Sequence, residues 1–348
     1  MQRRSSRTVK AGSVAIGGGA RVSVQSMLNK YAHDIEGNIA QALALERAGC
    51  DIIRAAVPDQ ESVKLIAALK GHCVAPIVAD IHFDYRLALE SLAAGADKIR
   101  INPGNIGGQD RVKAVADACR ARNVPIRIGV NSGSLEKDLL AKHGAPTPQA
   151  MAESALGHAR LLEACDFYDI VISLKSSDVA ATVRAYEILA GQCDYPLHVG
   201  VTEAGTQHMG IVKSSIGIGA LLLRGIGDTI RVSLTAEPAE EVRAARDILR
   251  ALGQGSGPDI ISCPTCGRTK IDLIAMANEV ERRLAGCEKR ITVAIMGCAV
   301  NGPGEAREAD IGLAGGDGCA LLFRRGEILR KVPEDRAIDE LMEEIEGM

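Results

Sequence analysis

Residues 76–102 read PIVADIHFDYRLALESLAAGADKIRIN and contain one complete strand–helix–strand unit. The two ends, Pro76–Asp80 and Lys98–Asn102, are short runs rich in β-branched residues, which is typical of buried strands. Between them, Tyr85–Ala94 has its apolar residues at helical spacing, and Gly95 follows as a helix stop. A helical connection of this length joins parallel strands, so the stretch predicts an α/β fold.

The same unit recurs along residues 22–252. β-rich runs alternate eight times with segments of helical periodicity. Eight parallel units in roughly 250 residues predict a (β/α)8 TIM-like barrel, with a doubly wound open sheet as the alternative. The predicted strands are Val22–Met27, Asp51–Val57, Pro76–Asp80, Lys98–Asn102, Pro125–Val130, Asp169–Leu174, Leu197–Val201 and Thr229–Ser233. The predicted helices are Ile35–Ala48, Gln60–Lys70, Tyr85–Ala94, Gln109–Arg122, Thr147–Ala164, Asp178–Gln192, Lys213–Arg224 and Ala239–Leu252.

A turn-rich stretch, GQGSGP at 253–258, interrupts this alternation and is typical of a flexible linker. We therefore expect a barrel over residues 1–252, a linker over 253–259 and a small α/β domain over 260–348. In the small domain the pattern predicts a helix over 270–285, a strand over Ile291–Met296, short strands near 311–313 and 320–323, and a charged helix from Glu334.

The composition excludes several classes of partner. Aromatic residues make up 2% of the chain and Trp is absent, which argues against a surface that stacks on bases. The net charge of −3 gives no overall basic character. No apolar run approaches the roughly 18–20 residues of a membrane span. We expect neither nucleic acid nor a membrane as a partner.

The N-terminal stretch MQRRSSRTVK is basic but has no apolar segment behind it. This pattern is not that of a secretory signal, and we expect a frayed terminal arm. Ten cysteines in such a chain favour a reducing compartment, and hence the cytoplasm, and disfavour disulfides.

Polar residues at the carboxyl ends of barrel strands mark an active site. Arg100, Arg127 and Arg231 interrupt apolar runs (IRI, IRI and IRV), where a buried charge is costly unless it enters a polar cavity or is paired. Guanidinium groups bind phosphate oxygens in bidentate fashion, so several cations at one mouth predict a highly anionic ligand such as a diphosphate. The alternative is that each arginine pairs with Asp or Glu. The polar residues at these strand ends include Arg54, Arg100, Asn102, Arg127, Asn131, Lys175, Thr202, Arg231 and Ser233.

Four further residues near these strand ends are acid–base candidates, namely Asp80, His82, His198 and Glu203. A histidine in a strand is more often a structural core residue, whereas Glu203 follows a predicted strand end and is the stronger candidate. Carboxylates close to an arginine cluster normally stay ionised, so a proton donor among them needs a bound anion or burial to compensate.

The small domain carries a cysteine pattern but no histidine, because all seven His lie at or before position 208. Cys263 and Cys266 have the C-x₂-C spacing shared by zinc and iron–sulfur sites, and Cys298 precedes the glycine-rich stretch AVNGPGE. A structural zinc would need Cys287 or Cys319 as its fourth ligand, and a disulfide is disfavoured by the compartment. A [4Fe–4S] cluster held by Cys263, Cys266 and Cys298 would leave one iron for an exchangeable ligand, for which Glu305 is the candidate.

The chain resembles the bacterial 4-hydroxy-3-methylbut-2-enyl diphosphate synthase family over essentially residues 7–345. The resemblance rests on VQSM (24–27), ADIHFDYR (79–86), KIRINPGNIG (98–107), IRIGVNSGSLEKDLL (126–140), VTEAGT (201–206), GIGDTIRVSLTAEP (225–238), CPTCGRT (263–269) and GCAVNGPGE (297–305).

This resemblance implies an activity and a set of partners. Family members reductively open the ring of 2-C-methyl-erythritol 2,4-cyclodiphosphate with two electrons from flavodoxin or ferredoxin. It also implies a [4Fe–4S] cluster on Cys263, Cys266, Cys298 and Glu305, diphosphate binding by the barrel Arg, Asn, Lys and Ser residues named above, and proton delivery by Glu203. A head-to-tail homodimer, in which the cluster domain of one subunit caps the barrel of the other, is implied as well.

The chain departs from the family pattern at residues 28–31, where LNKY replaces the usual Thr-Asn-Thr stretch, and we predict no more there than a first βα loop. It lacks the large barrel insertion of the plant-type form. Two alternative functions remain: a phosphate-binding barrel enzyme of aldolase or synthase type with a structural metal domain, and a non-catalytic iron–sulfur carrier.

Overall fold

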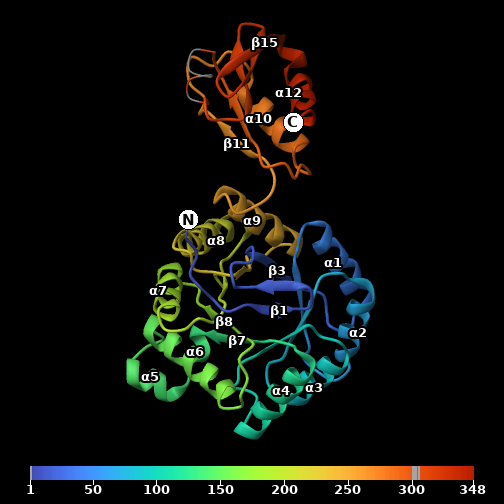
Figure 1. The fold of residues 1–348 in the computed structure, drawn as a ribbon, viewed down its shortest axis with the longest axis vertical. Coiled ribbons are helices and arrows are strands. Elements are labelled where there is room, and N and C mark those ends of the chain that lie inside the picture. Colours follow the sequence, from blue (N-terminus) through green and yellow to red (C-terminus); the bar gives the residue numbers. More distant parts are fainter. Residues whose placement is uncertain (1, 300–303, 305) are drawn as a thin grey trace. The chain divides into compact units, whose positions relative to one another are not determined.

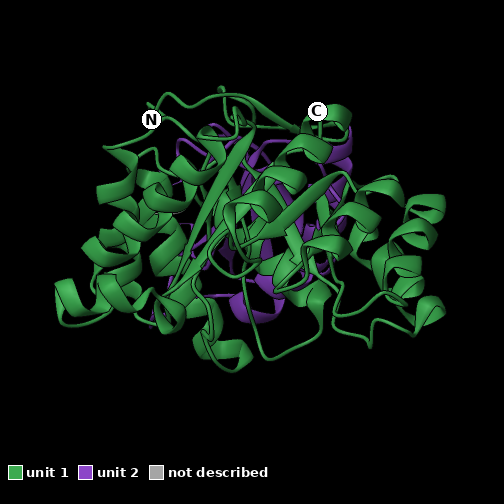
Figure 2. Cartoon of the chain, turned by 90° about the horizontal axis from the view of Figure 1, so that it is seen from below, with its two compact units in different colours: residues 1–252 green, residues 253–348 purple. Residues whose placement is uncertain are grey.

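The computed structural model describes residues 2–299, 304 and 306–348. The chain divides into two compact units, residues 1–252 and residues 253–348 (Figure 1; Figure 2). Each unit has a hydrophobic core of its own. In the described residues no helix has both the length and the apolar character needed to cross a membrane.

The first unit contains eight parallel strands in the order β8-β7-β6-β5-β4-β3-β10-β9. An isolated parallel bridge between Ile172 and Leu197 links the two ends of this order. The sheet is therefore a nearly closed barrel, as predicted, and not the doubly wound open sheet. The strands are β3 (Ser23–Met27), β4 (Ile52–Ala56), β5 (Ile77–Asp80), β6 (Lys98–Ile101), β7 (Ile126–Asn131), β8 (Ile170–Lys175), β9 (His198–Val199) and β10 (Thr229–Ile230).

Helices surround these strands (Figure 1). Several begin at side chains that satisfy free backbone amides; Asp178, for example, accepts a hydrogen bond from the Ala181 amide at 2.8 Å. The helices are α1 (Ile35–Arg47), α2 (Val63–His72), α3 (Tyr85–Ala93), α4 (Gln109–Arg122), α5 (Lys137–His143), α6 (Pro148–Glu163), α7 (Val179–Ala190), α8 (Gln207–Leu223) and α9 (Pro238–Ala251), with a 3-10 turn at Ser132–Ser134. The eight predicted helices are all present, and α8 begins six residues earlier than predicted.

Successive strand residues alternate between the helices and the barrel interior. Ile53, Ile77, Ile99 and Ile126 belong to the core that packs against the helices. Their neighbours on the opposite face point inward. This alternation carries the charged residues of the strands into the centre of the barrel.

A hairpin that the sequence analysis did not predict lies across the amino-terminal end of the barrel. Its strands, β1 (Val9–Ala11) and β2 (Val14–Ile16), pair antiparallel. Val9 and Ile16 pack on Ile52, Val78 and Val171, which are inward-facing residues near the starts of their strands. This apolar plug closes one end, so the polar interior opens only toward the carboxyl ends of the strands.

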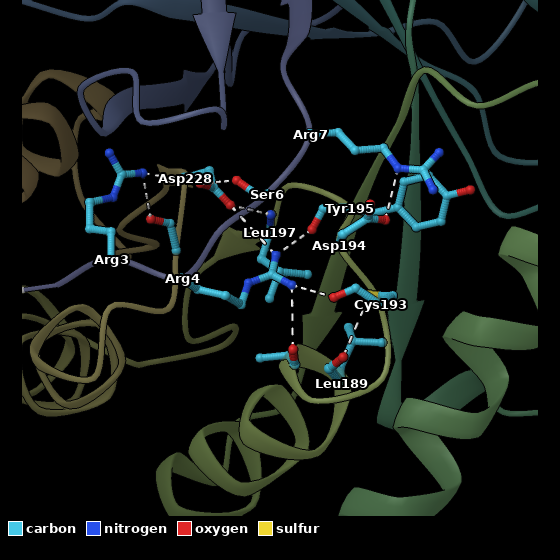
Figure 3. Close-up of polar contacts among 12 residues, drawn as sticks. Arg3, Arg4, Ser6, Arg7, Leu189, Cys193, Asp194, Tyr195, Leu197 and Asp228 are labelled. Atoms are coloured by element: carbon cyan, nitrogen blue, oxygen red, sulfur yellow. Dashed lines mark hydrogen bonds and ion pairs between the residues drawn. The ribbon is translucent and has the colours of Figure 1, made fainter.

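The N-terminal arm is anchored, and the expectation of a frayed arm was wrong (Figure 3). Arg3 forms an ion pair of 3.0 Å with the buried carboxylate of Asp228, and Arg4 donates to the backbone carbonyls of Cys193 and Tyr195. Arg7 pairs with Asp194 at 2.8 Å. These partners lie far along the chain, so composition alone gave no sign of them.

The second unit is a five-stranded sheet in the order β11-β12-β13-β14-β15, with β11–β13 parallel and β13–β15 antiparallel. α10 and α12 pack on one face through an aliphatic core. The predicted helix, strands and final helix are present, but β11 and β15 were not predicted. The elements are β11 (Asp259–Ser262), α10 (Leu273–Arg283), β12 (Thr292–Met296), β13 (Ile311–Gly316), β14 (Cys319–Arg324), β15 (Glu327–Pro333), a 3-10 turn at Glu334–Arg336 and α12 (Ala337–Glu346).

Candidate active site

Asp80, at the end of β5, joins two arginines inside the barrel. Arg54 Nη2 donates to Asp80 Oδ2 at 2.6 Å, and Arg100 Nη1 donates to Asp80 Oδ1 at 3.2 Å. The strand register places Arg100 directly opposite Asp80 on the neighbouring strand. Burial alone would raise the pKa of Asp80, but Arg54, Arg100 and His82 together hold it well below its usual range. The carboxylate is therefore ionised at neutral pH.

A second group of basic side chains lies on β7 and β8 and directly after β10. Arg127 is fully buried and donates to the Ser173 hydroxyl at 2.9 Å. Lys175 and Arg231 line a narrow pocket together with His198, Thr202 and Ser233. Burial lowers the pKa of Lys175 and of His198 well below their usual values, and the nearby arginines lower both further. The His198 imidazole is therefore neutral at pH 7.

The barrel interior contains more basic than acidic side chains. Only two carboxylates of the described residues pair with its cations: Asp80, and Glu241 of α9, whose Oε2 lies 3.6 Å from Arg231 Nε. Six basic side chains face them, and several of their buried nitrogen atoms have no hydrogen-bond partner in the described chain. Buried cations without partners are costly, so the cavity is built for an anion. The six are Arg54, Lys98, Arg100, Arg127, Lys175 and Arg231.

The remaining residues predicted at the mouth are spread around this cluster. Asn102 Oδ1 accepts the Gly104 amide at 3.0 Å and so shapes its own loop. Asn131 ends β7 directly beside Lys175 of β8. His82 Nε2 lies 3.9 Å from Asp80 Oδ2 and the ring is half-exposed. Glu203 is exposed and has a φ of +51°, a conformation that non-glycine residues rarely adopt and that clusters at functional sites.

In the second unit, two of the three predicted cysteine ligands follow neighbouring strands. β11 and β12 are parallel, with Ser262 opposite Ile295, so Cys263 and Cys298 leave the sheet at the same edge. The Gly297 amide donates to Cys263 Sγ at 3.2 Å. Cys266 is exposed, and hydrogen bonds from the Arg268 backbone and side chain lower its pKa, which favours the thiolate.

The described residues do not bring three metal-ligating side chains into one group. Glu305, the predicted fourth ligand, lies outside the described residues, as does most of the glycine-rich stretch after Cys298. Cys319 is buried at the start of β14, and Cys287 packs against the core of α10 and α12. These positions give the two spare cysteines a packing role.

Comparison with known families accounts for nearly the whole chain. The model of the GcpE TIM-barrel domain matches residues 6–246, and that of the GcpE protein C-terminal domain matches residues 259–347. The chain belongs to the GcpE family. The curated GcpE relatives include proteins named 4-hydroxy-3-methylbut-2-en-1-yl diphosphate synthase (flavodoxin). Those of Clostridium perfringens and Caldanaerobacter subterraneus are each 56% identical, covering 99% of this chain and 99% and 98% of their own lengths.

The GcpE barrel also resembles solved structures of other enzymes. A Yersinia pestis dihydropteroate synthase superposes with a TM-score of 0.53 at 15% identity, covering 71% of this chain and 97% of its own. A type I 3-dehydroquinate dehydratase of Clostridium difficile gives 0.53 at 16% identity, covering 71% and 98%. At such identities the likeness shows the barrel fold alone.

Sequence reasoning missed several polar residues of this GcpE interior, among them Gln25, Lys98, Ser173 and Glu241. Lys98 lies two residues before Arg100 on the same strand, so the alternation of strand faces was a signal that could have found it. Ser173 precedes Lys175 by the same interval. Glu241 comes from α9, and its contact with Arg231 crosses from a helix to a strand, which no local pattern reveals.

Proposed function

We propose that this chain is a 4-hydroxy-3-methylbut-2-en-1-yl diphosphate synthase. It would convert 2-C-methyl-erythritol 2,4-cyclodiphosphate, two electrons and two protons into 4-hydroxy-3-methylbut-2-enyl diphosphate and water. The observation that carries the proposal is the barrel interior with six basic side chains and two paired carboxylates. The names of full-length relatives at 56% identity support the same activity.

In this proposal the barrel holds the diphosphate. The diphosphate oxygens would accept hydrogen bonds from the unpaired N–H groups of the buried basic side chains. Asn and hydroxyl side chains at the mouth would complete the contacts. Fixing the diphosphate also stabilises it as a leaving group when the ring C–O bond breaks. The proposed ligands are Arg54, Arg100, Asn102, Arg127, Asn131, Lys175, Thr202, Arg231 and Ser233.

Asp80 and the proton donors take different roles. Because the carboxylate of Asp80 is ionised and bonded to Arg54 and Arg100, we assign it to positioning these arginines. At the mouth, His82 is half-exposed and Glu203 is exposed, so both side chains can exchange protons with solvent. We assign them the delivery of protons to the departing oxygen.

We further propose that the second unit binds a [4Fe–4S] cluster through Cys263, Cys266, Cys298 and Glu305. The three thiols fit this group, because two leave the same sheet edge, one accepts a backbone N–H and the third favours its thiolate form. The bound cluster would pass the two electrons to the substrate one at a time. Flavodoxin, named for the relatives, or ferredoxin is the proposed donor.

A homodimer with the head-to-tail arrangement completes the proposal. One face of α8 supports a subunit contact, since Met209, Val212, Ile216 and Leu223 are all exposed on a single helix. An isologous contact would bury this face against its own copy. We also place the protein in the cytoplasm, where its ten free thiols stay reduced.

An anaerobic turnover assay tests the activity. Iron-loaded protein receives the cyclodiphosphate and a chemical reductant, and mass spectrometry follows the product diphosphate. We expect product in proportion to cluster content. Protein that holds a full cluster but gives no product would refute the proposed substrate, and protein that binds one zinc without iron would favour a barrel enzyme with a structural metal domain.

A further inference from the structure

Lys98 is a basic residue inside the barrel with no acidic partner among the described residues. It begins β6, it is fully buried, and its Nζ has no hydrogen-bond partner among the described residues. Ile99 and Ile101 of the same strand face the helices, so Lys98 and Arg100 face the interior. The strand register sets Lys98 opposite Val78, a residue of the apolar plug. Lys98 therefore lies at the floor of the polar cavity, one level below Arg100.

The surroundings of Lys98 disfavour its charged form. Burial lowers the pKa of the amine well below its usual value, and Arg127 of β7 and Arg54 of β4 lower it further. His198 of β9, whose own pKa Lys98 helps to depress, is a neutral imidazole. Asp80 lies on the neighbouring strand β5. Its two carboxylate oxygens already accept hydrogen bonds, one from Arg54 and one from Arg100.

The other interior carboxylate of the described residues, Glu241 of α9, lies 3.6 Å from Arg231 and accepts hydrogen bonds from Ser26 and the Leu234 amide, so its charge is already engaged. Gln25 of β3 and Thr229 of β10 contribute a buried amide and a buried hydroxyl, and neither has a partner. The floor thus combines an amine whose charged form is disfavoured with unbonded polar groups, beneath several basic side chains. An anion that enters the cavity changes this balance, because a negative charge close by favours the protonated form of an amine.

We propose that Lys98 accepts a proton when the anionic substrate binds, so that substrate binding and proton uptake are coupled at the floor of the barrel. The inference rests on the proposed function, since it needs the cavity to hold a diphosphate. Lys98 then acts as a sensor of the anion: it carries no charge in the free barrel, and its ammonium adds one more N–H donor set once the diphosphate is present.

This coupling has a definite sign. The bound state holds one proton more than the free state in the pH range between the free and the bound pKa of Lys98, so affinity falls as pH rises. For one proton the dissociation constant increases about tenfold per pH unit within that range. Lys175 has a depressed pKa as well, so the wild-type uptake can exceed one proton, and Lys98 is measured by difference.

The test compares inorganic diphosphate binding by the full chain and by Lys98→Met. Titration calorimetry at pH 7, 8 and 9, in pairs of buffers that differ in ionisation enthalpy, gives the number of protons taken up. We expect Lys98→Met to take up about one proton fewer than wild type on binding. The increase of its dissociation constant per pH unit should be about tenfold smaller than that of wild type. Titration of the diphosphate itself is common to both proteins and cancels. Lys64→Met, at an exposed position of α2, is the matched control and should behave as wild type.

Each result decides between the two proposals. Equal proton uptake by wild type and Lys98→Met overturns the role of Lys98 while leaving the anion site intact. No binding of diphosphate by wild type overturns the anion site and therefore the proposed function. If Lys98→Met does not fold, Lys98→Gln provides a polar side chain that cannot take up a proton and is one atom shorter than lysine. Lysine ¹³Cε spectra of the wild type with and without diphosphate then follow the ionisation directly. The proposal is contradicted if no lysine signal moves from the amine to the ammonium position when diphosphate is added.

Discussion

Asp80 shows how one residue organises the cavity. Its two oxygens bond separate arginines on the strands to either side, which fixes the spacing of Arg54 and Arg100. A single carboxylate between two buried guanidinium groups leaves one positive charge uncompensated. Asp80 therefore stabilises the free barrel without neutralising it, and it leaves electrostatic attraction available for an anion.

Replacing Asp80 by Asn should destabilise the free protein strongly. Two buried arginines lose their partner charge, and removal of one member of a buried ion pair costs about 3–5 kcal/mol. Sulfate or diphosphate should restore part of the loss, because an anion can take the place of the carboxylate. Urea unfolding with and without sulfate measures both effects. Asp84→Asn, which breaks an exposed pair with Arg86, should cost less than about 1 kcal/mol. Equal losses for the two variants would contradict this account.

The sequence reveals part of the site at this scale. Arg100, Arg127 and Arg231 stand out because a charge between two isoleucines or valines conflicts with an apolar strand. The Arg54–Asp80 contact and the neutral state of His198 depend on which strands are neighbours, and that follows only from the closed order of the barrel. The acid–base roles stay predictions.

At the scale of elements, the N-terminal arm closes the weakest part of the barrel. β9 and β10 are only two residues long, and the bridge at Leu197 is isolated. Asp228, just before β10, accepts the Leu197 amide at 2.9 Å, the Ser6 hydroxyl at 3.0 Å and the Arg3 guanidinium at 3.0 Å (Figure 3). The arm thus ties the short strands together through one buried carboxylate.

Asp228→Asn should therefore lower the free energy of unfolding by about 1–3 kcal/mol, since the amide presents N–H groups to donors that lose their acceptor. Thermal or urea unfolding measures the change. Asp194→Asn is the matched control. It removes the charge that pairs with Arg7, and because Asp194 is more exposed than Asp228 the expected cost is below about 1 kcal/mol. If Asp228→Asn has the same free energy of unfolding as wild type, the contacts of the arm do not stabilise the barrel.

The elements that sequence reasoning missed share a physical cause. β1, β2, β11 and β15 are short or strongly exposed, so they lack the long apolar period that identifies the barrel strands and helices. The hairpin is specified by contacts with Ile52, Val78 and Val171, which lie elsewhere in the sequence. Long periodic segments were predictable, whereas elements held by tertiary contacts were not.

The apolar face of α8 leads to a prediction about assembly. Ile216 is 58% exposed near the middle of this face, and a charge there should oppose burial against a second subunit. We expect Ile216→Glu to convert a dimer into a monomer in light scattering at micromolar concentration while the fold is retained. Leu161→Glu, at another exposed apolar position on α6, should stay dimeric. A dimeric Ile216→Glu would move the contact to another face.

At the scale of the whole molecule, the proposed cluster divides the cysteines into ligands and core residues. Cys298→Ser should lose the iron and the brown colour of the anaerobically loaded protein, because serine replaces a thiolate ligand. Cys319→Ser, at a buried position in β14, should retain iron with at most a loss of stability. Iron analysis and the visible spectrum distinguish the two. Loss of iron in Cys319→Ser with retention in Cys298→Ser would reverse the assignment.

The proposed head-to-tail dimer predicts that a site is shared between subunits. Each unit has its own core, so a defect in one unit should leave the other folded. Arg127→Met disables the barrel, and Cys298→Ser disables the cluster unit. In a mixed dimer of these two chains, one site combines both defects and the other combines an intact barrel with an intact cluster unit.

Mixed dimers isolated through two different tags should therefore recover about half of the wild-type turnover, although each variant alone is inactive. If the barrel and the cluster unit of one chain formed a site together, both sites of the mixed dimer would carry a defect and no activity would return. A mixed dimer of Arg127→Met and Lys175→Met is the control, because two barrel defects leave no intact site in either arrangement. Recovery in the first mixture and not in the second would show that the chain acts as half of each of two active sites.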